Sequence, residues 1–170
     1  MATLVIIDMQ EHFLSARDTA LQESICDLIA KQKSAGGRIV LVEYSQCGKS
    51  VTSIRSALAG YDHVITVKKR ADDGSTAILT SLRKVGWLDS PEFILCGVNT
   101  PYCVLHTARG LEKKLGPRSS MYIDPRYCNT TADTREIGRK LSEVALYTWQ
   151  YDNVRNRNSH ISESLFHNQG

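Results

Sequence analysis

The sequence predicts an α/β fold: a Rossmann-like arrangement of three layers, in which a doubly wound, mostly parallel six-stranded sheet carries helices on both faces. Short apolar runs without polar alternation are typical of strands buried on both faces. Amphipathic segments separate these runs, so that strand and helix alternate about six times along the chain. A length of 170 residues with 42% hydrophobic side chains suits a single core.

Six apolar runs are expected to form the strands. They are Thr3–Ile7, Arg38–Val42, His63–Val67, Glu92–Leu95, Ser120–Ile123 and Val144–Thr148. Helices are expected between them, where apolar residues recur at helical spacing and capping residues mark the ends. They cover Leu21–Ile29 with Gly36 as a stop, Val51–Ala59, the segment from Ser75 to Gly86, Cys103–Leu115 with Gly116 and Pro117 behind it, and a last segment that begins at Thr131.

The chain is expected to form one domain over residues 1–150, followed by a polar tail over residues 151–170. Neither an internal repeat nor a low-complexity stretch divides the first part. The tail is rich in Asn and Ser, and we expect it either to fray or to pack on a partner subunit.

The net charge and the cysteines limit which classes of binding partner and which cellular compartment we expect for the protein. The formal net charge of +3 is too small to favour nucleic acid or a membrane as a partner. The first apolar run, Leu4–Ile7, is too short for a signal segment or a membrane span. An odd number of cysteines without regular spacing argues against a disulfide framework and favours a reducing cytoplasm. The sequence has neither a CxxC pair nor an HExxH motif, so we expect no metal.

Reactive side chains follow three of the expected strands. The first strand ends at Asp8, the third ends at Lys68, and Gly97–Cys103 leads from the fourth strand into a helix. Ligands of open parallel sheets bind at the carboxyl ends of the strands. We therefore expect Asp8, Lys68 and Cys103 to meet at one edge of the sheet, within one or two hydrogen-bond lengths of each other.

These residue types together are suited to nucleophilic catalysis. A thiol at a helix N-terminus beside an ammonium group is expected to have a lowered pKa, which would make Cys103 the most reactive of the five thiols. A carboxylate can take the thiol proton and return it to a leaving amine, and backbone N–H groups can bind an oxyanion. Each residue alone also has an ordinary explanation: a loop cap for Asp8, a solvated charge for Lys68, and a small core residue for Cys103.

Three segments resemble motifs of the isochorismatase-like cysteine hydrolases, a superfamily that includes nicotinamidases and N-carbamoylsarcosine amidase. They are Val5–Gln10 on the first strand, Val67–Arg70 followed by Ser75, and Gly97–Ala108 around the expected nucleophile. Asp124, after the fifth strand, also matches a recurrent aspartate. The resemblance extends over residues 3–148, nearly the whole expected fold.

The resemblance implies a hydrolase that cleaves a C–N bond, amide or ureido, of a small molecule. Cys103 would form an acyl-enzyme, Asp8 would act as acid and base, and Lys68 would give electrostatic support. A cis peptide bond between Val98 and Asn99 would direct the N–H groups of Asn99 and Cys103 into an oxyanion hole. The resemblance further implies a homo-oligomer, dimer or tetramer, and no cofactor is expected.

The segment after the lysine departs from the family pattern. The family often has Ser-Ala-Phe four residues after the lysine, whereas here Ala71–Gly74 intervene and no Phe follows Ser75. Phe13, Tyr44 or Tyr102 would then supply the aromatic wall of the substrate pocket.

The same insertion makes Lys69 an alternative to Lys68. We favour Lys68, because it directly follows the β-branched run. Side chains alternate along a strand, so Lys69 would face the opposite side.

A metal site of the nicotinamidase type is not expected, because Glu43–Gly48 lacks the Asp-x-His pattern. Nicotinamide is therefore a doubtful substrate.

Three other functions remain open at this point. An inactive family member could bind a small ligand or a partner protein, in keeping with the altered segment near Ser75. A vinyl-ether hydrolase resembling isochorismatase itself is disfavoured by the presence of Cys103. A redox thiol protein is a poorer candidate, because no CxxC pair exists.

Overall fold

The computed structural model describes residues 1–130 and 143–147, and within them the chain forms a parallel sheet flanked by helices. The sheet has the strand order β3-β2-β1-β4-β5. Every paired strand runs parallel to its neighbour. The strands are β1 (Thr3–Ile7), β2 (Ile39–Tyr44), β3 (Val64–Lys69), β4 (Glu92–Val98) and β5 (Ser120–Asn129). The predicted α/β class is confirmed.

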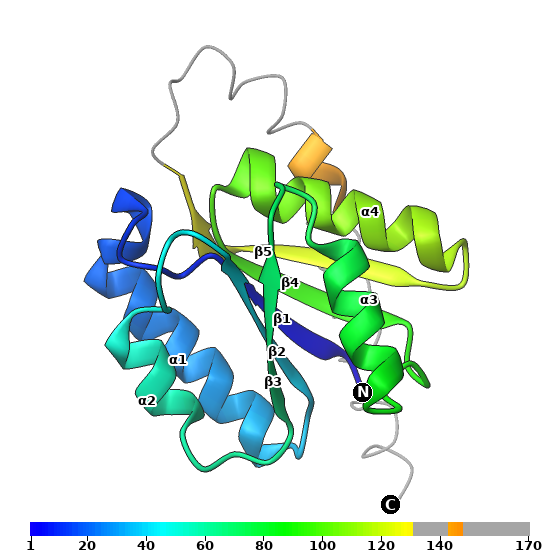
Figure 1. Ribbon diagram of the computed structural model, residues 1–170, viewed down its shortest axis with the longest axis horizontal. Coiled ribbons are helices and arrows are strands. Elements are labelled where there is room, and N and C mark those ends of the chain that lie inside the picture. The colour runs from blue at the N-terminus through cyan, green and yellow to red at the C-terminus, as the bar shows by residue number, and fades with distance from the viewer. Residues whose placement is uncertain (131–142, 148–170) are drawn as a thin grey trace, which may run out of the picture.

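Helices cover both faces of the sheet (Figure 1). On one face lie α1 (Thr19–Ser34) and α2 (Thr52–Leu58), and on the other lie α3 (Ser75–Lys84) and α4 (Leu105–Leu115). Two short turns complete the described elements, the 3₁₀ turn η1 (Leu14–Arg17) and the π-helical turn η2 (Thr100–Val104). Asp18 caps α1, because its side chain accepts hydrogen bonds from the N–H groups of Ala20 and Leu21.

The two faces of the sheet bury two separate apolar clusters. On β1, Val5 and Ile7 belong to the cluster beneath α3 and α4, whereas Leu4 and Ile6 belong to the cluster beneath α1 and α2. All four side chains are fully buried, which explains why the strand shows no polar alternation in the sequence. This alternation also decides which later side chains can meet Cys103, because Cys103 belongs to the cluster of Val5 and Ile7.

The described sheet has five strands rather than the predicted six. Residues 143–147 are helical, whereas Val144–Thr148 was expected to form the sixth strand. Val144 and Tyr147 are buried against the first cluster, whereas Leu146 is exposed. This three-residue spacing of buried side chains fits a helix and not a strand, so the short apolar run was assigned the wrong period. The helix expected from Thr131 and the tail over residues 151–170 lie outside the described residues.

The strand order reverses direction around β1. The chain moves outward from β1 through β2 to β3, and then returns to place β4 on the other side of β1. Asp8 follows β1 and Asn99 follows β4, and these are the only non-glycine residues with positive φ in the described chain, at 55° and 62°. Two strained residues at neighbouring strand ends mark this edge as a candidate site.

Gly97 allows β4 to approach β1 next to Asp8. Its φ is +119°, and a Cβ atom added there would lie 2.0 Å from the backbone oxygen of Ile7. The two residues are register partners in the sheet. Any side chain at position 97 would therefore push apart the two strands that carry the site.

We expect Gly97→Ala to lower the free energy of unfolding by about 3 kcal/mol or more, because it combines a steric clash with an unfavourable φ. Gly60→Ala is the matched control, since Gly60 has φ +68° but nothing within 4 Å of an added Cβ. Gly60→Ala should lower the free energy of unfolding by only about 1 kcal/mol. Urea denaturation measures both, and equal losses would contradict the close approach at Gly97.

Candidate active site

A buried ion pair joins the end of β1 to the end of β3. Lys69 Nζ lies 2.8 Å from Asp8 Oδ2, and both side chains are almost completely inaccessible to solvent. Since β2 lies between these two strands, the long lysine side chain reaches across the end of β2. The contact lacks good hydrogen-bond geometry, so that within the described residues both Asp8 oxygens can still accept a hydrogen bond.

Lys68 does not join this pair, and its predicted place beside Asp8 is wrong. The side chains of β3 alternate, as expected, but Val67 and Lys69 are buried while Lys68 is exposed. Lys68 Nζ instead lies 2.7 Å from Glu43 Oε2 on the other face of the sheet. The lysine on the site's face of β3 is therefore one residue later than predicted, and the structure places Lys69 at the site.

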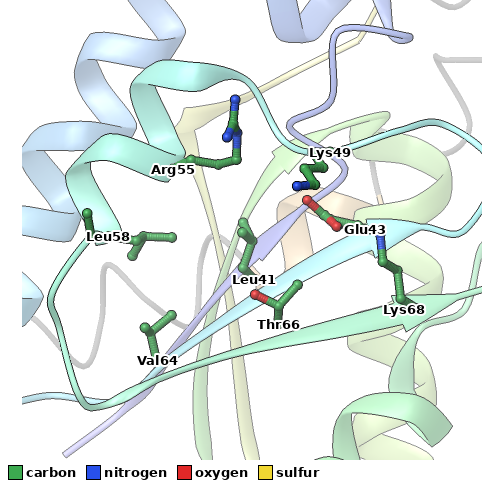
Figure 2. Close-up of a pocket in the computed structure, with 9 residues that line it drawn as sticks. Leu41, Glu43, Lys49, Arg55, Leu58, Val64, Thr66 and Lys68 are labelled. Atoms are coloured by element: carbon green, nitrogen blue, oxygen red, sulfur yellow. Dashed lines mark hydrogen bonds and ion pairs between the residues drawn. The ribbon is translucent and has the colours of Figure 1, made fainter.

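Lys68 and Glu43 border a pocket of about 390 Å³ between β3 and α2 (Figure 2). Leu41 and Thr66 line it from the sheet, and Arg55 lines it from α2. Burial raises the pKa of Glu43, but hydrogen bonds from Lys68 and Ser50 outweigh burial and hold the pKa below its usual range. None of Asp8, Lys69 and Cys103 lines this pocket.

Cys103 completes the cluster of reactive side chains. It lies in η2, directly before α4, and only 4% of its surface is exposed. Its thiol interacts with both Asp8 and Lys69. The structure thus brings Asp8, Lys69 and Cys103 together at the carboxyl edge of the sheet, and Lys68 is not among them.

The charges of Asp8 and Lys69 cancel, and burial and the neighbouring charges act on the pKa values of both side chains. Burial raises the pKa of Asp8, and this effect exceeds the lowering by Lys69 and Cys103 beside it. Burial lowers the pKa of Lys69, but the charge of Asp8 outweighs burial and raises the pKa above its usual value. Lys69 is therefore an ammonium group at neutral pH, and it faces a carboxylate that binds protons more readily than usual.

The predicted lowering of the Cys103 pKa is wrong. Burial and the negative charge of Asp8 raise the pKa of the thiol to about 12, against the lowering effect of Lys69. The sequence-based argument counted the lysine and the helix terminus, but not the desolvation of the thiol. Cys103 is consequently a neutral thiol at neutral pH, and it could act as a nucleophile only after a base had removed its proton.

The residues that depart from the family pattern lie directly on this cluster. We call residues 71–74 the 71–74 loop. Within it, Asp72 Oδ1 accepts a hydrogen bond of 3.7 Å from Cys103 Sγ. Sequence reasoning missed Asp72, since it treated the loop only as an insertion that displaces an aromatic residue. A carboxylate within a few residues of a strand's carboxyl end was the available signal.

The three aromatic residues expected to form a substrate wall lie in different places. The ring of Tyr44 covers Lys69, with 4.5 Å from Nζ to the ring centroid, and its hydroxyl donates to the Arg70 carbonyl. Tyr44 and Arg70 also border an open hollow of about 440 Å³ next to the buried pair. Tyr102 is half-buried in η2 beside Cys103. Phe13 packs against the cluster of the opposite face.

The peptide bond between Val98 and Asn99 is trans, because the described residues contain no cis peptide bond. The predicted cis bond is therefore wrong. The chain changes direction instead through the left-handed conformation of Asn99, which Asn tolerates better than most residues. The oxyanion hole at the N–H groups of Asn99 and Cys103 stays a prediction.

In the described part of the chain, no group of three or more His, Cys, Asp or Glu side chains is placed to hold a metal ion. Within the same residues, no helix is both long enough and apolar enough to cross a membrane.

Residues 2–114 match the family model of the isochorismatase domain, which is more than half of the chain. The protein therefore belongs to the isochorismatase family, whose members are hydrolases and include amidases. The family resemblance read from the three motifs is confirmed. No curated protein sequence matches the chain.

Solved structures with low sequence identity share the fold. The MAR1 ribonuclease of Caenorhabditis elegans is similar with a TM-score of 0.70 at 15% identity, over 86% of this chain and 73% of that chain. The nicotinamidase of Staphylococcus aureus is similar with a TM-score of 0.65 at 17% identity, over 85% of this chain and 93% of that chain. N-carbamoylsarcosine amidase from Thermoplasma acidophilum is similar with a TM-score of 0.61 at 18% identity, over 78% of this chain and 87% of that chain. At these identities the similarity concerns the fold alone.

We expect Lys69→Met to lower the free energy of unfolding at pH 7 by about 3 kcal/mol, because it leaves Asp8 as an unpaired buried charge. The loss should shrink towards pH 4, where Asp8 can be buried as a neutral acid. Lys68→Met is the matched control and should cost less than about 1 kcal/mol, since Lys68 is half exposed and Ser50 still donates to Glu43. Denaturant titrations at both pH values measure the difference, and a larger loss for Lys68→Met would refute the buried pair.

The rate of Cys103 alkylation by iodoacetamide should rise about tenfold per pH unit between pH 7 and 10 without levelling off, because only the thiolate reacts and the thiol pKa lies near 12. Peptide mass spectrometry gives the rate at Cys103 separately from the other cysteines. Cys96 is the internal control, since it is fully buried and should remain unmodified while the fold persists. A plateau below pH 8 would show instead that the thiol is activated at rest.

Proposed function

We propose that the protein hydrolyses a C–N bond of a small amide or ureido compound through a thioester on Cys103. The observation that carries this proposal is the contact of the Cys103 thiol with a buried Asp8–Lys69 ion pair at the carboxyl edge of the sheet. The membership of the isochorismatase family supports the reaction class. Lys69, rather than Lys68, is assigned the electrostatic role.

In the first half of the proposed reaction, Asp8 removes the thiol proton as the sulfur attacks the carbonyl carbon. A high thiol pKa requires a base in contact with the thiol, and Asp8 meets this condition with a raised pKa of its own. The tetrahedral intermediate collapses when its C–N bond breaks, and Asp8 gives the proton to the leaving amine. The acyl group then remains on Cys103 as a thioester.

In the second half, water attacks the thioester carbon and its proton passes to Asp8. The carbon–sulfur bond breaks, the proton returns to the sulfur, and the acid product leaves. Lys69 stays protonated throughout, because its pKa is raised. Its fixed positive charge stabilises the thiolate character that develops on sulfur, while Asp8 keeps the resting site from carrying an unpaired cation.

Ammonia release from a panel of small primary amides and ureido compounds tests the reaction. We expect turnover by the wild-type protein and a loss of at least about a thousandfold in Cys103→Ala and in Asp8→Asn. Cys96→Ala is the matched control and should keep turnover, since Cys96 lies on the other face of the sheet. Acid quenching during turnover should trap an acyl adduct on Cys103 by mass spectrometry, and turnover that survives Cys103→Ala would refute the mechanism.

A family member that binds a small ligand without turnover is the second candidate. It is favoured by one observation: the thiol is buried, protonated and hydrogen-bonded to Asp72. Such a protein would bind an amide in equilibrium dialysis but release neither ammonia nor an acyl adduct on Cys103.

We also propose a reducing cytoplasmic location and a homo-oligomeric state for this enzyme. All five cysteines are free thiols, in keeping with a reducing compartment. Light scattering coupled to size exclusion would measure the oligomeric state directly.

A further inference from the structure

A second carboxylate faces the sulfur of Cys103 from a different element than Asp8. Asp72 Oδ1 lies 3.7 Å from Sγ, on the loop between β3 and α3. A thiol is a weak hydrogen-bond donor, so this contact satisfies the carboxylate poorly. A charged N–H donor at the same place would form a stronger and shorter hydrogen bond.

The 71–74 loop is held in place by its backbone, and not by the Asp72 side chain. Lys69 Nζ donates to the carbonyls of Ala71 and Asp72 at 3.1 and 3.3 Å. Thr107, one turn after Cys103 on α4, donates to the Asp72 carbonyl and accepts from the Gly74 N–H. The carboxylate of Asp72 is thus presented to the sulfur by a fixed loop.

The charges around the sulfur leave Asp72 without a countercharge among the described residues. Asp8 and Lys69 form an ion pair, and Cys103 is a neutral thiol at neutral pH. On the same loop, the carboxylate of Asp73 turns to α4, where Lys114 Nζ lies 3.4 Å away. The site therefore carries one net negative charge, directed at the position where the scissile carbonyl would bind.

We propose that the site selects cationic substrates, namely small amides with an ammonium nitrogen two or three bonds from the scissile carbonyl carbon, and that Asp72 binds this group. The inference rests on the proposed hydrolase function, because the bound cationic amide is a substrate only if the protein hydrolyses it. The distance from Asp72 to the sulfur sets the position of the cation, because a carbonyl carbon bonded to Sγ would place an α- or β-ammonium group within reach of the carboxylate.

The charge preference can be measured at Cys103 without turnover. The probes are two methanethiosulfonates of similar size, one with a trimethylammonium group and one with a sulfonate group. The measured quantity is the ratio of the cationic to the anionic rate at Cys103, by peptide mass spectrometry, relative to the ratio for free cysteine. Any general change in thiol pKa affects both rates equally and cancels in the ratio.

We expect a relative ratio well above one for the wild-type protein and a fall of about tenfold in Asp72→Asn. Asp72→Glu should keep the preference for the cation. Asp73→Asn is the matched control on the same loop, and its ratio should stay within about twofold of wild type, because Lys114 neutralises Asp73. A wild-type ratio at or below one overturns the proposal, and it would follow if the positive charge of exposed Arg70 dominated the electrostatic potential at Cys103. An unchanged ratio in Asp72→Asn overturns the proposal as well.

Ammonia release from a matched charge series provides the second arm. Glycinamide should be hydrolysed faster than propionamide, and malonamate slowest, with the differences reduced in Asp72→Asn. Equal or faster hydrolysis of propionamide contradicts the charge preference but not the hydrolase. If no amide in the series or in the wider panel releases ammonia, the hydrolase proposal fails, while the methanethiosulfonate ratio still decides whether the site selects cations.

Discussion

The buried ion pair between Asp8 and Lys69 is the interaction on which the site depends. Two charges withdrawn from water cost several kcal/mol each, and only their mutual contact offsets this cost. The pair connects strands that are not neighbours, so it is possible only because the lysine side chain extends over the end of β2 beneath the ring of Tyr44. The same contact fixes a carboxylate and an ammonium group against one thiol. The pair that stabilises the edge of the sheet therefore also contains the carboxylate proposed to move the proton.

Much of the fold could be predicted, because a parallel sheet imposes a pattern that is visible in the sequence. Strands buried on both faces must be apolar at successive positions, and β1 to β5 were found on that basis. The sixth strand was wrong because a run as short as Val144–Thr148 does not separate a period of two from a period of 3.6. The choice between the two lysines had a usable signal. Ile65 and Val67 share a face with Lys69, whereas the less apolar Thr66 shares a face with Lys68, so the more apolar face carried the buried lysine.

Other properties of the site could not be predicted, because they arise from contacts between segments distant in sequence. The approach of Asp72 to Cys103 depends on Thr107 and on the absence of a side chain at Gly110, where an added Cβ would lie 2.4 Å from Asp73 and Ser75. The high thiol pKa depends on burial beneath the loop, which a motif does not reveal. The conformation at Asn99 is another case, since the motif implied a cis bond and the structure uses positive φ.

The protonated, enclosed state of Cys103 also bears on how the protein tolerates oxidants. Peroxides attack thiolates, and their attack is favoured by exposure to solvent. A sulfur that is 4% exposed and protonated at neutral pH presents little target to peroxides. Cysteine enzymes that keep a permanent thiolate gain reactivity at rest but are exposed to sulfenic acid formation. In the proposed mechanism the thiolate forms only when a substrate is bound, so that oxidation could occur only in the brief interval in which Asp8 holds the proton.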